Sequence, residues 1–410
     1  MNSRTSIRRV VPLFVAAFLI SSAIESADWT RWRGPDQSGA SHEEQVFGEG
    51  KPELDLAWNR PLGIAYSGIS VANGKAVTMF ADGEIDWLTA IDAASGEEIW
   101  RYRIDTMFPK VGGAHGGPLS TPVISGDVVY GLGARGQLFA VALDDGSELW
   151  SIRIDETLGA KPPKFGFTTT PLVVGKALFV QTGGEAGRSL TALDRKTGEL
   201  LWATGDEPVG YQSPILAELA GQKQIVSVTN KSIAGLAPQD GTVLWQKKHD
   251  LVERDGWATP LQIGADAFLL VERMESVAFR VEKTGDSFAV SELWRGTNLK
   301  NNFAAPVVHD GNIYGYSGDF LTCVNARTGE QLWKARSSAA GLILVDGHLV
   351  IFGKDGAVLV AEASPEGYEE KARVKVSETA GYTFPSFSDG GIFVRGLDDI
   401  GRVDVVRPPK

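Results

Sequence analysis

One pattern of apolar and polar positions recurs along the chain: an alternating apolar stretch, a glycine turn, two or three polar residues, then a tryptophan. The complete copies are LTAIDAASGEEIW ending at Trp100, LFAVALDDGSELW at Trp150, LTALDRKTGELLW at Trp202, IAGLAPQDGTVLW at Trp245 and LTCVNARTGEQLW at Trp333. The glycine stands four residues before the tryptophan in each copy. Alternation predicts strands, and a period of roughly 40 to 50 residues predicts one four-stranded propeller blade per copy.

Three less regular segments complete the ring. One copy reaches Trp294 through a longer hairpin, and another, from Val358 to Val374, has lost its tryptophan. ELDLAW, ending at Trp58, has the form of an outermost strand without partners, and Phe384 to Val406 offers three short strands at the other end of the chain. Joining them leaves no open sheet edge. The sequence therefore predicts an all-β fold, an eight-bladed β-propeller of four-stranded antiparallel blades, closed by N- and C-terminal strands in one blade.

The tryptophans are expected on the outermost strands, where an indole can fill the gap between neighbouring blades. Each ring would remove about 150 to 250 Å² from water, so we interpret the repeat tryptophans as structural. The stretch Ser213 to Val228 has good helix propensity. Its place in the repeat nevertheless predicts a strand, a turn at Gly221 and a second strand.

The N-terminus has the layout of a secretory signal peptide. Arg8 and Arg9 precede an apolar stretch from Val10 to Ala23, and small residues follow. We predict a signal peptide over residues 1–23, with cleavage after 27 as the alternative, a lead-in over 24–53 and the propeller over 54–410. The protein is therefore expected in the periplasm or outside the cell, with Sec export favoured over twin-arginine export and the two routes left open.

Net charge and cysteine content limit the kinds of partner and of site that the chain can have. The formal net charge is −11 and becomes −14 without residues 1–23, which disfavours nucleic acid and anionic lipid. No later apolar run is long enough to predict a membrane span. Cys323 is the only cysteine, so an intramolecular disulfide, a lipoprotein anchor and a cysteine-rich zinc site are all excluded. We interpret Cys323 as a small buried apolar residue, and we expect a monomer.

The repeat resembles that of the pyrroloquinoline-quinone (PQQ)-type β-propellers. ALDRKTGELLW and CVNARTGEQLW carry the likeness most clearly, and it extends from about residue 54 to the C-terminus. The lead-in DWTRWRGPDQSG, from Asp28 to Gly39, is similar to the opening of secreted bacterial members that resemble the outer-membrane-assembly propeller protein.

The resemblance implies two possible functions, because one branch of the family is catalytic and another is not. The quinoprotein dehydrogenases hold PQQ over calcium in the funnel, and several have a disulfide of adjacent cysteines that this chain cannot form. The assembly branch is a scaffold for protein partners. We therefore predict an exported, non-catalytic propeller that binds a protein or other ligand in the cell envelope and needs no cofactor. The alternative is a small quinoprotein oxidoreductase with PQQ and calcium.

Residues just before each blade's first strand suggest a site. Because first strands line the central channel, these positions should ring one of its mouths. Seven of the eight blades carry a ring side chain there: Tyr66, His115, Phe167, Tyr211, Trp257, Phe303 and Tyr382. Such rings could hold a planar ligand or an apolar side chain of a peptide, or they could simply pack on neighbouring loops.

Under the quinoprotein alternative, Trp257 would lie beneath the quinone, and Asp255 and Asn302 would be among the metal ligands. Otherwise no metal ligand is assigned. No nucleophile motif, P-loop or dinucleotide fingerprint stands in a suitable context, so no catalytic residue is assigned either. The segments Thr106 to Gly113 and Lys161 to Phe165 depart furthest from the repeat and are expected at the same mouth as His115.

Overall fold

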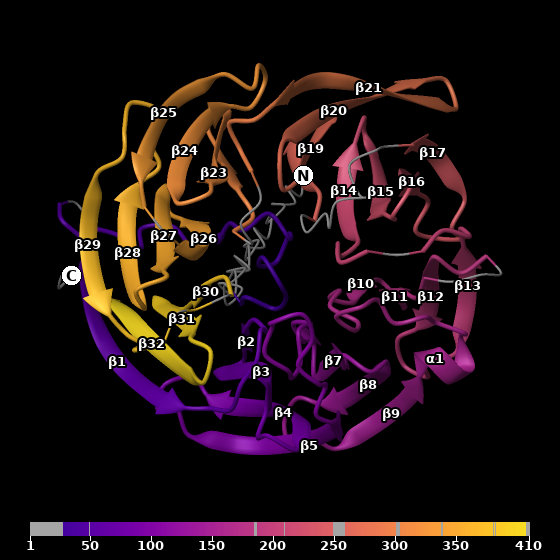
Figure 1. Cartoon of the computed structure of the whole chain (residues 1–410), viewed down its shortest axis with the longest axis horizontal. Helices are drawn as coiled ribbons and strands as arrows, with labels where there is room; N and C mark the ends of the chain where they lie inside the picture. Colours follow the sequence, from indigo (N-terminus) through magenta and orange to yellow (C-terminus); the bar gives the residue numbers. More distant parts are fainter. Residues whose placement is uncertain are drawn as a thin grey trace, which may run out of the picture.

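The computed structural model describes residues 28–48, 50–183, 187–208, 210–248, 259–300, 304–337, 339–379, 381 and 383–406. Eight four-stranded antiparallel sheets stand around a central axis, which confirms the predicted eight-bladed propeller (Figure 1). In blades 1 to 7 the chain runs from an inner strand at the axis to an outer strand at the circumference.

The blades follow the chain in order. Blade 1 consists of β2 (Ser70–Ala72), β3 (Lys75–Ala81), β4 (Ile85–Asp92) and β5 (Glu98–Thr106), and blade 2 of β6 (Val123–Ser125), β7 (Val128–Leu132), β8 (Gln137–Ala142) and β9 (Glu148–Arg153). Blade 3 consists of β10 (Leu172–Val174), β11 (Ala177–Gln181), β12 (Leu190–Asp194) and β13 (Leu200–Thr204), and blade 4 of β14 (Ile215–Leu219), β15 (Gln222–Val228), β16 (Ser232–Leu236) and β17 (Val243–Lys248). Blade 5 consists of β18 (Leu261–Gly264), β19 (Ala267–Val271), β20 (Ser276–Thr284) and β21 (Ser287–Gly296). Blade 6 consists of β22 (Val307–His309), β23 (Asn312–Ser317), β24 (Phe320–Asn325) and β25 (Gln331–Arg336), and blade 7 of β26 (Ala339–Val345), β27 (His348–Gly353), β28 (Ala357–Glu362) and β29 (Glu370–Lys375).

Blade 8 closes the ring with both ends of the propeller sequence. It contains β30 (Ser386–Ser388), β31 (Gly391–Arg395) and β32 (Asp399–Val406), and its outer strand is β1 (Glu53–Pro61). The antiparallel pairing of β1 with β32 runs from Glu53 opposite Val406 to Pro61 opposite Asp399. The predicted closure is confirmed, and so are the two strands, β14 and β15, expected in the helix-prone segment. One short helix, α1 (Ile154–Thr157), follows blade 2.

The repeated glycine and tryptophan meet across the blade boundary. A Cβ atom added to Gly146 would lie 2.6 Å from the indole of Trp100, which belongs to the preceding blade. The same relation recurs for Gly96 with Trp58, Gly198 with Trp150, Gly241 with Trp202 and Gly329 with Trp294. Glycine is therefore favoured at these positions for two reasons. It leaves room for the indole, and its positive φ, close to 74° in each turn, is a conformation that residues with a side chain rarely adopt. An indole of one blade thus packs against the glycine backbone of the next blade, and we call this contact the indole lock.

In blades 1 to 6 a small residue of the adjacent strand makes room for the indole, whereas Trp58 of blade 8 lies opposite Arg402. Trp100, for example, faces Ala90 of the adjacent strand, and Trp333 faces Cys323. One extra residue bulges out of the strand beside the tryptophan, and this explains why the residue just before it, such as Leu149 at 54% exposure, is solvent-facing. Cys323 is fully buried, as expected for a small apolar residue.

Three of the eight blade boundaries depart from this pattern. Between blades 6 and 7, no described glycine meets Trp333, whose indole N–H donates to the carbonyl oxygen of Ser364 at 2.9 Å and whose ring packs near Tyr368. Trp245 donates its indole N–H to Gln224 within its own blade, at 2.6 Å, and stacks on Phe268 of blade 5. The outer strand of blade 7, β29, carries no tryptophan, so the boundary between blades 7 and 8 lacks an indole lock.

The lead-in crosses the central channel and hydrogen-bonds to inner strands on several sides. Trp29 and Thr30 accept backbone N–H groups from Val71 of blade 1 and Ile124 of blade 2, both at 2.8 Å. Gln37 bonds to the backbone of blade 4, and Gly39 and Ser41 pair with Leu344 of blade 7. Glu43 then accepts the N–H of Asp389 in blade 8 at 2.6 Å. The segment is therefore an internal strap that blocks the channel.

Arg33 holds the strap in place. Its guanidinium donates to the carbonyl oxygens of Gln37 at 3.1 Å, Ser38 at 2.6 Å and Pro306 of blade 6 at 2.5 Å. The charge lies 5.6 Å and 5.8 Å from the ring centroids of Trp32 and Phe384. Burial without a carboxylate partner lowers the pKa of Arg33 to about 9. The side chain is thus a structural link between the strap and two blades.

We expect Gly241→Ala to destabilise the protein more than Gly221→Ala. Both glycines have a φ near 75°, but a Cβ at Gly221 meets open space whereas one at Gly241 meets Trp202 at 2.6 Å. Overpacking costs about 1 to 3 kcal/mol beyond the shared backbone strain. Denaturant unfolding of the two variants measures the difference, and equal losses would contradict the indole lock.

Arg33→Lys should lower the free energy of unfolding by about 2 kcal/mol or more, since an ammonium group cannot reach all three carbonyl oxygens. Arg31→Lys is the matched control, because Arg31 makes one long hydrogen bond, 3.5 Å, to Val173. Thermal and denaturant unfolding should show a much smaller loss for the control. Similar losses for both variants would argue against a strap held by Arg33.

Candidate functional site

A cavity with a volume of about 410 Å³ lies in the channel above the strap, and we call it the funnel. Its floor is formed by Trp29, Trp32 and Arg33 of the lead-in. Its rim comes from loops that join an outer strand to the next inner strand, and includes Tyr66, Gly112, Ala114, Phe165 and Tyr211. The wall between them consists of Gly68, Ile69, Leu119, Thr121, Thr168, Thr170, Ser213, Thr259, Thr383, Phe384, Pro385 and Ser386.

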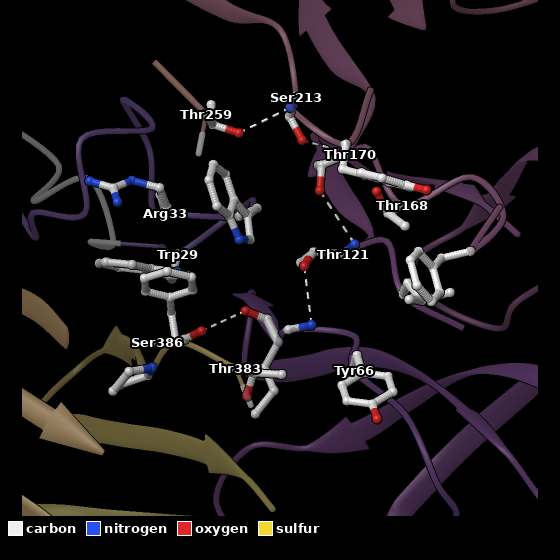
Figure 2. A pocket seen from close by; sticks show the side chains of 18 of the residues that line it. Trp29, Arg33, Tyr66, Thr121, Thr168, Thr170, Ser213, Thr259, Thr383 and Ser386 are labelled. Carbon is white, nitrogen blue, oxygen red and sulfur yellow. Dashed lines mark hydrogen bonds between the residues drawn. The ribbon is translucent and has the colours of Figure 1, made fainter. Parts of the chain in front are cut away.

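A series of hydroxyl groups follows the wall from blade to blade (Figure 2). The Oγ1 of Thr121 accepts the N–H of Gly68, and its own N–H goes to the Oγ1 of Thr170 at 3.3 Å. The N–H of Thr170 goes to Ser213 at 2.9 Å, and that of Ser213 goes to Thr259 at 3.0 Å. Ser386 closes the series by donating to Ile69 at 2.6 Å. The wall is thus fixed by bonds between blades.

Two of the predicted ring side chains line the funnel. Tyr66 and Tyr211 stand at the rim, half-buried, and Tyr211 packs against Phe165 with ring centroids 5.9 Å apart. His115 lies beside the rim, where its backbone N–H donates to the Tyr66 hydroxyl at 3.0 Å. Phe167 lies elsewhere: it is 1% exposed and packs in the core between blades 2 and 3. The structure therefore brings three of these four residues together.

The other predicted positions fall outside the described residues. They are Trp257, Phe303 and Tyr382 of the ring series, and Asp255 and Asn302 of the quinoprotein alternative. The two segments that depart furthest from the repeat do reach the rim, where they supply Gly112 and Phe165. Lys164 lies over the Phe165 ring, 5.2 Å from its centroid.

Sequence reasoning missed the floor and the hydroxyl wall. The lead-in showed two tryptophans and two arginines in DWTRWRGP, but it lies outside the repeat, and nothing in its pattern indicates that it enters the channel. The wall had a visible signal, because Thr121, Thr170, Ser213 and Thr259 each precede a proline at the start of an inner strand. The predicted ring residues lie a few positions earlier in the sequence than these hydroxyls.

Arg33 is the only charged residue in the described lining of the funnel. Among the described residues that line it there is no carboxylate, and the described part of the chain has no group of three or more His, Cys, Asp or Glu side chains placed to hold a metal ion. Calcium prefers several carboxylate and carbonyl oxygens. The described lining therefore does not supply the ligand set that a calcium-bound quinone would need.

One buried acid lies on the same face as the rim but outside the funnel. Glu272 follows β19, is 3% exposed, and neither of its carboxyl oxygens has a hydrogen-bond partner in the described structure. Burial, reinforced by the nearby charge of Glu275, raises the pKa of Glu272 to about 8. The protonated form is therefore favoured in the folded state.

This shift predicts a loss of stability as the pH rises. The folded state holds the Glu272 proton up to about pH 8, whereas the unfolded chain releases it near the ordinary glutamate pKa of 4.5. Stability should therefore fall between these two values and level off above the higher one. We expect Glu272→Gln to flatten this part of the pH profile of the unfolding midpoint, with Glu282→Gln, at an exposed position of β20 in the same blade, as the control. An unchanged profile in Glu272→Gln would contradict the shift.

The fold and the repeat together define an eight-bladed propeller whose repeat resembles that of the PQQ-like proteins. The sequence profile of the family described as "Outer membrane protein assembly factor BamB" matches residues 84–256. The chain is 26% identical over 275 residues to the outer membrane protein assembly factor BamB of Yersinia pestis, a match that covers 64% of each chain. These matches confirm the resemblance predicted from the repeat: the chain is similar to the PQQ-like repeat propellers and to the outer-membrane-assembly proteins.

A catalytic relative is also similar in part. The chain is 33% identical over 198 residues to the quinohemoprotein alcohol dehydrogenase ADH IIB of Pseudomonas putida, covering 44% of this chain and 28% of that enzyme. The crystal structure of BamB from Moraxella catarrhalis superposes with a TM-score of 0.65 at 15% identity, covering 87% of this chain and 99% of that one, which shows the fold alone. The matched segments span less than two thirds of the Pseudomonas and Yersinia relatives. Within the described residues, no helix has the length and apolar character needed to cross a membrane.

Proposed function

We propose that the protein is an exported, non-catalytic propeller whose rim and funnel bind a protein partner or another ligand in the cell envelope. The observation that carries the proposal is the construction of the funnel: one mouth, a floor from the lead-in, and a rim of rings from different blades. Pockets that are mainly apolar with a few fixed polar groups are the usual form of binding sites. The name of the Yersinia relative, an assembly factor, agrees with a role in binding other proteins.

The polar groups near the rim support binding rather than chemistry. Glu207, which precedes the rim residue Tyr211, accepts hydrogen bonds from the hydroxyls of Thr229 and Ser232. Arg33 is held by three carbonyl oxygens. These groups are occupied in fixing loops, so none of them is poised as a nucleophile or base.

The quinoprotein alternative rests on the partial likeness to the Pseudomonas enzyme. The indole floor would suit the flat face of a quinone, but the described lining lacks calcium ligands. Its proposed ligands, Asp255 and Asn302, lie outside the described residues. We therefore favour the binding function.

Site-specific photo-crosslinking tests the proposal. With p-benzoylphenylalanine in place of Lys164, which is exposed at the rim, the mature protein should form a discrete adduct with an envelope component in its own cells. The same probe in place of Lys176 is the matched control, because Lys176 is an exposed lysine in the turn after β10, on the opposite face of blade 3. Adducts should come from the rim position alone.

Two results would count against the proposal. One is the absence of adducts at Lys164, or equal adducts at both positions. The other is a mature protein that retains quinone absorbance after incubation with PQQ and calcium and desalting, and then reduces a dye in the presence of an alcohol or a sugar.

A further inference from the structure

We propose that the funnel binds the ring of an uncharged sugar, such as a mono- or disaccharide or the end of a glycan. This inference rests on the binding function proposed above and names its ligand class. It follows from three properties that occur together in the described lining of the funnel: hydroxyl protons without acceptors among the described residues, aromatic surfaces around them, and no available charge.

The wall offers hydrogen-bond donors that the protein itself does not use. Thr121, Thr170, Ser213 and Thr259 are 3 to 7% exposed, and each hydroxyl accepts one backbone N–H. Among the described residues, no acceptor is recorded for the proton of any of the four. The Oγ1 of Thr168, also in the wall, has no hydrogen-bond partner at all in the described structure. A hydroxyl has one donor and two acceptor positions, so these groups would be satisfied by a ligand rich in oxygen.

The floor and rim offer flat apolar surfaces on several sides of these hydroxyls. The partly exposed rings in the lining are those of Trp32, Tyr66, Phe165, Tyr211 and Phe384, whereas Trp29 is 2% exposed and supports the floor from beneath. A sugar ring combines both requirements, because its C–H groups pack on aromatic rings while its hydroxyl and ring oxygens accept and donate hydrogen bonds. A volume of about 410 Å³ is within the usual range for small-molecule sites.

Charge favours a neutral ligand over an acid or an amine. The Arg33 guanidinium points away from the hydroxyl series in Figure 2 and is taken up by carbonyl oxygens. The described lining has no carboxylate to receive a cation. A net charge of −11 would also repel an anion before it reached the mouth.

Calorimetric and saturation-transfer NMR titrations of the mature chain, lead-in included, test this inference. The probes are glucose, galactose, N-acetylglucosamine, maltose and cellobiose at millimolar concentrations, with benzoate as a flat apolar acid. We expect at least one sugar to bind and benzoate not to bind. Thr168→Val should weaken sugar binding about three- to tenfold, the effect of one lost hydrogen bond, without loss of stability, since that hydroxyl has no partner in the protein.

Thr322→Val is the matched control. Thr322 is fully buried, its Oγ1 also has no partner in the described structure, and it lies in β24 of blade 6, outside the funnel lining. Sugar affinity should therefore be unchanged in Thr322→Val. Tyr211→Ala should weaken binding as well, because a stacking surface at the rim is lost.

The inference is overturned if none of the five sugars binds, if benzoate binds in their place, or if Thr168→Val and Thr322→Val have the same effect on affinity. These results are separable from a failure of the proposed function. Adducts at Lys164 without sugar binding would contradict only the sugar as the ligand and would leave the proposed binding function supported. The absence of both adducts and sugar binding would contradict both proposals.

Discussion

The packing of an indole from one blade against a glycine of the next is the interaction on which the ring depends. At five of the eight blade boundaries it brings the neighbouring blades close together, because the indole packs on a backbone that has no side chain to hold it away. It also explains two other features of the repeat. A small residue stands opposite the tryptophan in blades 1 to 6, and a bulge beside it turns the preceding apolar residue outward. Packing between blades therefore decides the local sequence of the outer strands.

The central channel is shaped by a segment that is not part of the repeat. Eight inner strands alone would leave an open passage, and the strap converts one end of it into a floor. Arg33 makes this possible, since three carbonyl oxygens and two aromatic rings compensate for a buried charge. Structural stability and the candidate site are thus connected, because the residues that hold the strap also form the bottom of the funnel.

The blade pattern could be predicted from the sequence because it is repeated and local. Five copies with the same glycine-to-tryptophan spacing determine strand positions, and the split blade follows from the need to close the sheet edge. The floor could not be predicted in the same way. Trp29, Trp32 and Arg33 occur once, and their position depends on hydrogen bonds to inner strands far away in sequence. The interpretation of the ring residues was limited for a related reason: Tyr66 and Phe167 occupy similar sequence positions, but one lines the funnel and the other is buried between blades.

The boundary between blades 7 and 8 shows what a closed ring tolerates. Its indole is missing, yet the strap contacts Asp346 in blade 7 and Asp389 in blade 8, and so spans the same boundary from inside. In an open stack of sheets, losing that contact would let the terminal sheet detach. In a circle, the two blades cannot separate unless a second joint opens as well. Loss of the tryptophan at one blade boundary is therefore far less damaging in a closed ring than the same loss would be in a linear array of sheets.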